Sequence, residues 1–379
     1  MSPALTKTIS LLLLIAIGYL LRNKIKNKDQ RDGIKTLILS LALPATIFIA
    51  LLQVDFKLDM IIIPIVALTF NLIIFILLDK GPWATMLNIP QNQYRTLIML
   101  IPSLAPGLSC FPFIMEYSGQ EPLALAALAD VGNKVFVLIF LYTVAMNWFY
   151  GQHASLTPKG KGKLKSLLIA LVNEPVNVVI LTAIGMLSLG LSYTSFPEFV
   201  TLSIDRLSLM MTPLVLLFIG FSVKLTYDQV RTIFSFLFFR AGIAFFLSGL
   251  LLFFFPVDNP ALVLLIIVFP QSACSFWPYA HMAAVGQMEK KEGISQKDTM
   301  FDLDFAMNVL ACSMPFSVIL IMAIYSGSEY IASTPAVFIA SAVFAGVGLL
   351  IVVLTAKYSS VFKSDPVEMK MEIQKSGQE

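Results

Sequence analysis

Charged residues are scarce in this chain of 379 residues. Asp, Glu, Lys and Arg make up 13% of it and hydrophobic residues 58%, whereas about a quarter of an ordinary soluble domain is charged. The mean hydropathy of +0.84 excludes a soluble globular protein and indicates that most of the chain lies in lipid. The formal net charge of +3 suits loops that face anionic lipid better than a nucleic-acid-binding surface.

Residues typical of enzyme chemistry are also few. The sequence has two His and three Cys, and Cys110, Cys274 and Cys312 fall in apolar segments without the spacing of a metal site. It has no phosphate-cradling glycine pattern and no nucleophilic triad. We therefore expect a protein that is not an enzyme and that uses no metal or cofactor.

Long apolar segments are what the sequence has instead. A helix needs about 20 apolar residues to cross a bilayer. Eleven segments approach this length, at residues 3–21, 35–54, 58–78, 96–115, 122–149, 166–190, 198–223, 231–256, 260–283, 302–325 and 335–356. They predict an all-α integral membrane protein.

Lysine and arginine collect in alternate connections between these spans. One side holds the basic clusters at 22–35, 159–165 and 290–297, while the connections on the other side hold only Lys7 and Lys57. Positively charged residues favour the cytoplasmic side. This asymmetry predicts a protein of the cell (inner) membrane with its N-terminus outside and its C-terminus in the cytoplasm.

Short motifs of the first half return in the second half, in the same order and about 167 residues later. Ala-Ile-Gly at 16–18 returns at 183–185, and Pro44 and Pro213 both follow a Leu-Ser-Leu motif. Since five spans form each unit, the two units enter the membrane from opposite sides. The pattern predicts an inverted repeat, which is typical of secondary transporters.

The repeat divides the chain into five parts. They are a first repeat at 1–156, a cytoplasmic linker at 157–166, a second repeat at 167–326, an extra transmembrane helix at 327–357 and a cytoplasmic tail at 358–379. In the extra helix, small residues at 340, 341, 345, 346 and 348 suit close packing on another helix.

The fourth and ninth spans contain several prolines each. Pro102, Pro106 and Pro112 lie in the fourth and Pro270 and Pro278 in the ninth. Proline interrupts a helix, and interrupted helices in membranes present backbone amides and carbonyls to substrates and ions. The candidate substrate-binding residues at these interruptions are Ser103, Pro106, Gly107, Ser109, Gln271, Ser272 and Ser275.

The fifth span contains Asp130, Asn133 and Lys134. The spacing of four residues puts Asp130 and Lys134 on one helix face. A carboxylate with a breakable partner suits proton coupling, and the same pair also suits static charge neutralisation. We take Asp130, Asn133 and Lys134 as candidate ion-coupling residues, together with Asn308, which is the repeat counterpart of Asn133.

Arg240 lies in the middle of the eighth span. Arginine stays charged and can bind a carboxylate with two hydrogen bonds. We expect Arg240 to bind an organic anion or to pair with an acidic residue of a neighbouring helix.

These features together resemble the auxin efflux carrier (PIN-like) family, which includes plant auxin exporters and bacterial organic-acid permeases. The resemblance is carried by Ile-Gly-Tyr-Leu-Leu-Arg at 17–22, Leu-Ser-Leu-Ala-Leu-Pro-Ala at 39–45, Thr-Pro-Leu at 212–214 and Ile-Gly at 219–220. It implies two inverted five-helix repeats with crossing broken helices 4 and 9. It also implies a scaffold of spans 1, 2, 6 and 7 and a core that moves by an elevator mechanism. The family commonly has asparagine at the fourth-span break, where this chain has Ser103 and Ser109.

The sequence therefore predicts a secondary transporter of a small organic anion, proton-coupled or driven by the membrane potential. A homodimer through spans 2 and 7 is the expected assembly, with the bilayer and the anion as the other partners. One alternative is a sodium-coupled carrier of the bile-acid symporter type. Another is a transporter-like sensor or interaction protein that binds a ligand without moving it.

Overall fold

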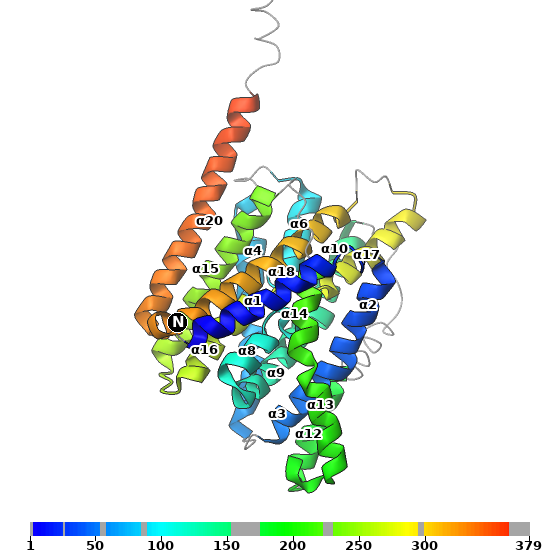
Figure 1. Cartoon of the computed structure of the whole chain (residues 1–379). Helices are drawn as coiled ribbons and strands as arrows, with labels where there is room; N and C mark the ends of the chain where they lie inside the picture. Colours follow the sequence, from blue (N-terminus) through cyan, green and yellow to red (C-terminus); the bar gives the residue numbers. More distant parts are fainter. Residues whose placement is uncertain are drawn as a thin grey trace, which may run out of the picture.

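The computed structural model describes residues 3–25, 27–53, 58–84, 89–152, 175–222, 230–294 and 299–363. Helices are the only regular secondary structure in these ranges (Figure 1), which confirms the all-α prediction. Within them, seven helical stretches are long and apolar enough to cross a membrane.

The long stretches agree closely with the predicted spans. They are Asp29–Leu52, Ile62–Lys80, Gln120–Gln152, Glu198–Phe221, Val230–Phe254, Leu303–Ser326 and Thr334–Ile351. Three more predicted spans contain the shorter apolar helices Ile9–Leu21, Pro175–Ser188 and Pro260–Gln271. The remaining one, 96–115, is divided among three helices. Of the eleven predicted spans, seven thus correspond to long apolar helical stretches.

The first half of the chain forms α1 (Pro3–Leu21), α2 (Lys28–Leu37), the π-helix η1 (Ile38–Ala42), α3 (Leu43–Leu52), η2 (Leu58–Ile61), α4 (Ile62–Lys80), α6 (Gln91–Leu100), α7 (Pro106–Ser109), α8 (Phe111–Ser118), α9 (Gln120–Val135), the π-helix η3 (Phe136–Phe140) and α10 (Leu141–Gln152). The second half forms α12 (Pro175–Ser188), η5 (Tyr193–Ser195), α13 (Glu198–Leu209), α14 (Met211–Ser222), α15 (Val230–Phe254), α16 (Pro260–Val268), η6 (Phe269–Gln271), α17 (Trp277–Lys291), α18 (Leu303–Ser326), α19 (Ser328–Ile331) and α20 (Thr334–Lys363).

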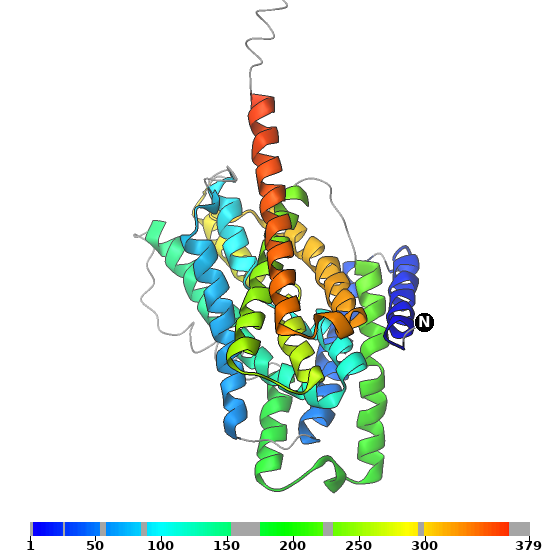
Figure 2. The same ribbon diagram turned by 90° about the vertical axis from the view of Figure 1, so that its left-hand side faces the viewer.

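Glycine allows α1 and α14 to cross in close contact at the edge of the bundle (Figure 2). A Cβ atom added to Gly18 would lie 2.4 Å from the Leu217 carbonyl oxygen, and one added to Gly220 would lie 2.1 Å from that of Ile15. Small residues are the usual means by which membrane helices approach backbone to backbone. The Gly18 and Gly220 motifs of the sequence therefore meet in space.

The extra helix α20 packs along α15 and extends beyond the rest of the bundle (Figures 1 and 2). Ser341 donates a hydrogen bond of 2.8 Å to the Gly242 carbonyl. A Cβ atom on Gly242 would lie 2.6 Å from the Ala345 nitrogen, and one on Gly348 would lie 2.8 Å from the Phe239 nitrogen. The small residues thus form the predicted contact, except that Gly346 faces open space.

The domain boundaries lie partly outside the described residues. The linker at 157–166 falls there, as do residues 364–379 of the tail. Helix α20 continues to Lys363, beyond the predicted end at 357, because no proline or glycine interrupts residues 352–363.

Candidate functional site

The fourth predicted span is interrupted after α6. The helix ends at Leu100, residues 103–105 are not helical, and α7 begins at Pro106. Pro106 and Pro112 occupy the first turns of α7 and α8, where a proline needs no amide partner and its fixed φ suits a helix start. The prolines therefore start new helices here.

The ninth predicted span is interrupted in the same manner. Helix α16 continues into the short 3-10 helix η6, and residues 272–275 after it are not helical. Helix α17 then begins at Trp277, with Pro278 in its first turn. All the residues from 271 to 275 are buried. Two stretches of non-helical backbone thus lie inside the bundle, where their polar groups need partners.

The two stretches provide partners for each other. The Ala105 amide donates to the Ala273 carbonyl at 2.7 Å. The Ala273 amide donates to Ser109 Oγ at 2.9 Å, and the Ser275 amide donates to Ser103 Oγ at 3.0 Å. We expected such amides to be open to an anion. In this conformation these three donate within the protein instead.

Serine occupies corresponding positions in the two interruptions. Ser103 Oγ donates to the Leu100 carbonyl and Ser272 Oγ to the Phe269 carbonyl, each at 2.6 Å and each three residues back along the chain. Gln271 Nε2 donates to the Ala241 carbonyl of α15 at 3.3 Å. The hydroxyls thus bond to carbonyls at the ends of helices, which also accept from the Ser103 and Ser272 amides.

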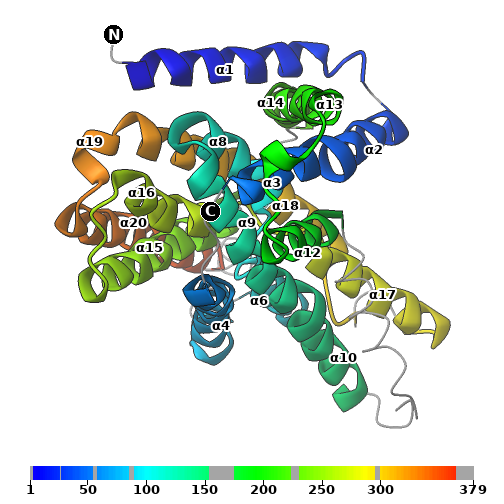
Figure 3. The ribbon, with the colours of Figure 1, turned by 90° about the horizontal axis from the view of Figure 1, so that it is seen from below.

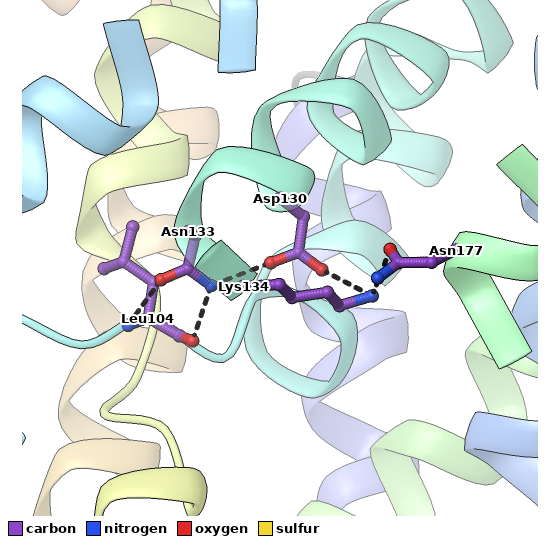
Figure 4. Close-up of polar contacts among 5 residues, drawn as sticks. All are labelled: Leu104, Asp130, Asn133, Lys134 and Asn177. Atoms are coloured by element: carbon purple, nitrogen blue, oxygen red, sulfur yellow. Dashed lines mark hydrogen bonds and ion pairs between the residues drawn. The ribbon is translucent and has the colours of Figure 1, made fainter. Parts of the chain in front are cut away.

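Asn133 on α9 pairs with the backbone of the first interruption (Figure 4). Its Oδ1 accepts from the Leu104 amide at 3.1 Å, and its Nδ2 donates to the Leu104 carbonyl at 2.9 Å. Nδ2 also donates to Asp130 Oδ1 at 2.8 Å. A single fully buried amide therefore connects the non-helical backbone at Leu104 to the carboxylate of Asp130.

Asp130 and Lys134 form the predicted ion pair on α9. Lys134 Nζ lies 3.2 Å from Asp130 Oδ2, and less than a tenth of either side chain is exposed. Lys134 Nζ also donates to Asn177 Oδ1 on α12 at 3.4 Å (Figure 4). A buried pair is held at a high desolvation cost, which hydrogen bonds of this kind offset.

Two residues of this cluster were not among the predicted site residues. Asn71 on α4 donates from Nδ2 to Asn133 Oδ1 at 3.1 Å, while its own Oδ1 is buried and has no hydrogen-bond partner. The other is Asn177. Each is an amide side chain within a strongly apolar helix, and this contrast is the sequence signal that could have found them.

Close packing supports the cluster from α4. A Cβ atom on Gly132 would lie 1.8 Å from the Pro64 carbonyl oxygen. Only glycine permits this approach of α9 to α4, which carries Asn71.

Arg240 contacts the second interruption. Its Nη2 donates to the Pro270 carbonyl at 3.2 Å and to the Ser272 carbonyl, and its Nη1 donates to Cys274 Sγ at 3.8 Å. Its Nε is buried without a partner. Among the described residues its hydrogen-bond acceptors are these two carbonyls and one thiol, and none of the three is an acidic side chain.

Three more predicted residues lie on α7 and α18. Pro106 is buried, and a Cβ atom on the half-buried Gly107 would lie 2.9 Å from a methyl group of Leu43. Asn308 is half-buried on α18. The described residues contain no cluster of three His, Cys, Asp or Glu side chains that could hold a metal ion.

Comparison with known proteins shows a distant likeness to a transporter. No family model matches the chain. Over 220 residues, 56% of this chain and 67% of the other, it is 24% identical to a protein named "Uncharacterized transporter MJ1031" from Methanocaldococcus jannaschii. The apolar helices and this likeness indicate a transporter-like integral membrane protein.

Proposed function

We propose that the protein is a secondary active transporter of a small organic anion, a carboxylate, that works by an elevator-type alternating-access mechanism. The observation that carries the proposal is the buried Asp130–Lys134 pair, which Asn133 connects to the non-helical backbone at Leu104. Ionisable residues inside membrane segments are costly, and they commonly mark ion and substrate pathways.

The proposed architecture is an inverted repeat of two five-helix units, similar to that of the auxin efflux carrier family, with broken helices 4 and 9 crossing at the site. Two observations support it. The two interruptions hydrogen-bond directly to each other, and each has a serine that donates to the carbonyl three residues earlier. In the proposed mechanism this conformation is a closed one. The amides of the interruptions donate to acceptors of the protein, and in another conformation they would donate to the substrate.

The proposed coupling ion is the proton, with the membrane potential as a further driving force. Protonation of Asp130 removes the counter-charge of Lys134 and leaves Lys134 and Arg240 as two cationic side chains in the core. This change favours entry of an anion. It also alters the acceptor of Asn133, and through Asn133 it reaches the backbone at Leu104.

In this proposal, the positive charge of Arg240 attracts the anion to the second interruption. Its buried guanidinium has an unused Nε donor and no carboxylate acceptor among the described residues. A buried charge of this kind is stabilised by an opposite charge, and the carboxylate of the substrate would supply it.

A sodium-coupled carrier of the bile-acid symporter type is the second candidate. The unpaired buried Oδ1 of Asn71 favours it, because amide and unwound carbonyl oxygens are the ligands that transporters offer to sodium. Asn71 Oδ1 and the Leu104 carbonyl oxygen would then be sodium ligands. The two residues lie near each other, since Asn133 forms hydrogen bonds with both.

The experiment that tests the function is uptake of labelled monocarboxylates, dicarboxylates and indole acids into proteoliposomes. Proton and sodium gradients are imposed separately, and empty liposomes serve as the control. Accumulation driven by the proton gradient supports the proposal, and accumulation driven by sodium alone supports the second candidate. Binding without flux would show instead a transporter-like sensor. The proposed location is the cell (inner) membrane, as a homodimer through spans 2 and 7, which cross-linking in membranes would test.

A further inference from the structure

An apolar cavity of about 440 Å³ lies between α4, α9, α15 and α16. Figure 3 shows these helices next to one another on one side of the bundle. The cavity volume is within the range of ligand-binding cavities, roughly 300–1,000 Å³. Leu104 and Pro270, whose backbone groups bond to Asn133 and Arg240, line its inner end.

No side chain of the cavity wall offers an unused polar group. Ser248 is its one polar side chain, and the Ser248 hydroxyl donates to the Ile266 carbonyl at 2.8 Å. The amide and carbonyl of Leu104 are held by Asn133, and the Pro270 carbonyl accepts from Arg240. A ligand of this cavity therefore has no charge or hydrogen-bonding group inside it.

The most exposed residues of the cavity wall lie near the connection between α15 and α16, and we take this end as its mouth. At this end Ile62 is 57% exposed and Phe255 is 67% exposed, whereas Leu104 at the inner end is 2% exposed. The mouth residues Ile62 and Phe255 stand at the ends of two helices that are long and apolar enough to cross a membrane. The mouth thus faces lipid, at the level where those helices end.

The depth of the cavity matches one leaflet of a bilayer. Its lining includes Val257, just before α16, and Pro270, at the far end of the same segment. Ten residues separate Pro260 from Pro270, so at ~1.5 Å per residue the inner end is about 15 Å deep. This is half of the ~30 Å hydrocarbon core.

We propose that this cavity binds one acyl chain of a membrane phospholipid. The head group would lie at the connection 255–259, and the chain would run inward until its end meets the backbone of Leu104 and Pro270. The bound acyl chain thus ends beside both interruptions, and its binding goes beyond the proposed transport activity.

Photolabelling of the full-length protein in lipid nanodiscs tests the proposal. The nanodiscs contain a phospholipid with a photoactivatable diazirine at the end of one acyl chain, and mass spectrometry locates the label. We expect label on residues at the inner end, such as Leu104 and Phe269. The lipid-facing Val343 and Leu349 of α20 give the reference level.

A variant that fills the cavity supplies the control. Ala67→Phe places a phenyl group among the lining residues, and we expect the inner-end label to be lost. Ala342→Phe adds the same group to an exposed position of α20 and should keep it. Leu251→Trp fills the cavity from α15 and serves as the second variant if Ala67→Phe does not fold.

Three outcomes would overturn the proposal. They are label on α20 but none at the inner end, inner-end label that persists in the folded cavity-filling variants, and inner-end label from a free diazirine fatty acid but not from the phospholipid. The last would assign the cavity to a free amphiphile. No substrate or ion gradient enters the measurement, so a failure of the transport proposal would leave its result unchanged.

Discussion

At the scale of single residues, the described contacts concentrate on Asn133. Its amide pairs with both backbone groups of Leu104 and also contacts Asp130 and Asn71. A non-helical residue in the bundle must satisfy its amide and carbonyl inside the protein. Asn133 does this for Leu104 as a neighbouring strand would.

Replacement of Asn133 should therefore destabilise the protein more than replacement of Asn71. Asn133→Ala leaves the amide and carbonyl of Leu104 without these partners, at about 1–3 kcal/mol for each unsatisfied buried group. Asn71→Ala removes one hydrogen bond, and its Oδ1 has no partner to lose. Thermal unfolding of the purified variants, followed by tryptophan fluorescence, measures the difference. Equal melting temperatures would contradict this role of Asn133.

Arg240 provides a second prediction, which separates binding from folding. Arg240→Ala should weaken carboxylate binding by more than tenfold, because a buried charge partner contributes about 2–5 kcal/mol to binding. Arg240→Lys keeps the charge and loses the fork of donors, so it should retain more of the affinity. Isothermal titration and thermal unfolding are compared for both variants. If unfolding changes as much as binding does, Arg240 is a structural residue that supports Pro270 and Ser272.

The sequence predicts some of these residues well and others not at all. The spacing of Asp130 and Lys134 on one helix is enough to predict their contact. The pairing of Asn133 with Leu104 joins residues 29 apart in the chain, and no local pattern reports such a contact. Two acceptors of Arg240 are backbone carbonyls. Because every residue has a backbone carbonyl, the sequence does not indicate which residues Arg240 contacts.

At the scale of helices, glycine determines where close contacts form. Gly242 and Gly346 are both helical glycines near the α15–α20 contact, but only Gly242 meets the other backbone. The sequence marks both positions as small, and the rotation of each helix decides which of them faces its neighbour.

This difference gives a prediction with a matched control. Gly242→Ala should lower the melting temperature, because its Cβ would lie 2.6 Å from the Ala345 nitrogen and overpacking costs about 1–3 kcal/mol. Gly346→Ala has open space and should be neutral or stabilising by about 0.5–1 kcal/mol, since alanine favours helix. Both are measured by thermal unfolding. A larger loss for Gly346→Ala would contradict the described packing of α20.

Some helix ends can be predicted from the local sequence, whereas contacts between helix ends depend on tertiary packing. The spans predicted at 198–223 and 231–256 are found at Glu198–Phe221 and Val230–Phe254, and local sequence accounts for this agreement, since long apolar segments predict these helices. Prolines predict the interruptions of the fourth and ninth spans, while the contact between the interruptions joins residues more than 160 apart in the chain and is not encoded locally.

At the scale of the whole molecule, the distribution of basic residues predicts which connections face each side of the membrane. The connection that contains Asp258 should lie outside and the one that contains Glu292 should lie in the cytoplasm. The three native cysteines are buried, so they give little background in labelling.

Labelling of single cysteines in intact cells tests this topology. A membrane-impermeant maleimide should react with Asp258→Cys in intact cells and with Glu292→Cys only after the membrane is opened. Both side chains are exposed. Reaction of both variants in intact cells, or the reverse order, would contradict the predicted orientation.

The central claim is that a proton on Asp130 couples to movement of an anion. Asp130→Asn tests it directly, because asparagine keeps an Oδ1 acceptor for Asn133 and removes the charge that pairs with Lys134. The measurement compares proton-driven accumulation of the carboxylate with its exchange at equal pH in proteoliposomes. We predict that the variant loses accumulation and keeps exchange. Unchanged proton-driven accumulation would show that the pair is a static neutralisation of charge and would contradict the account.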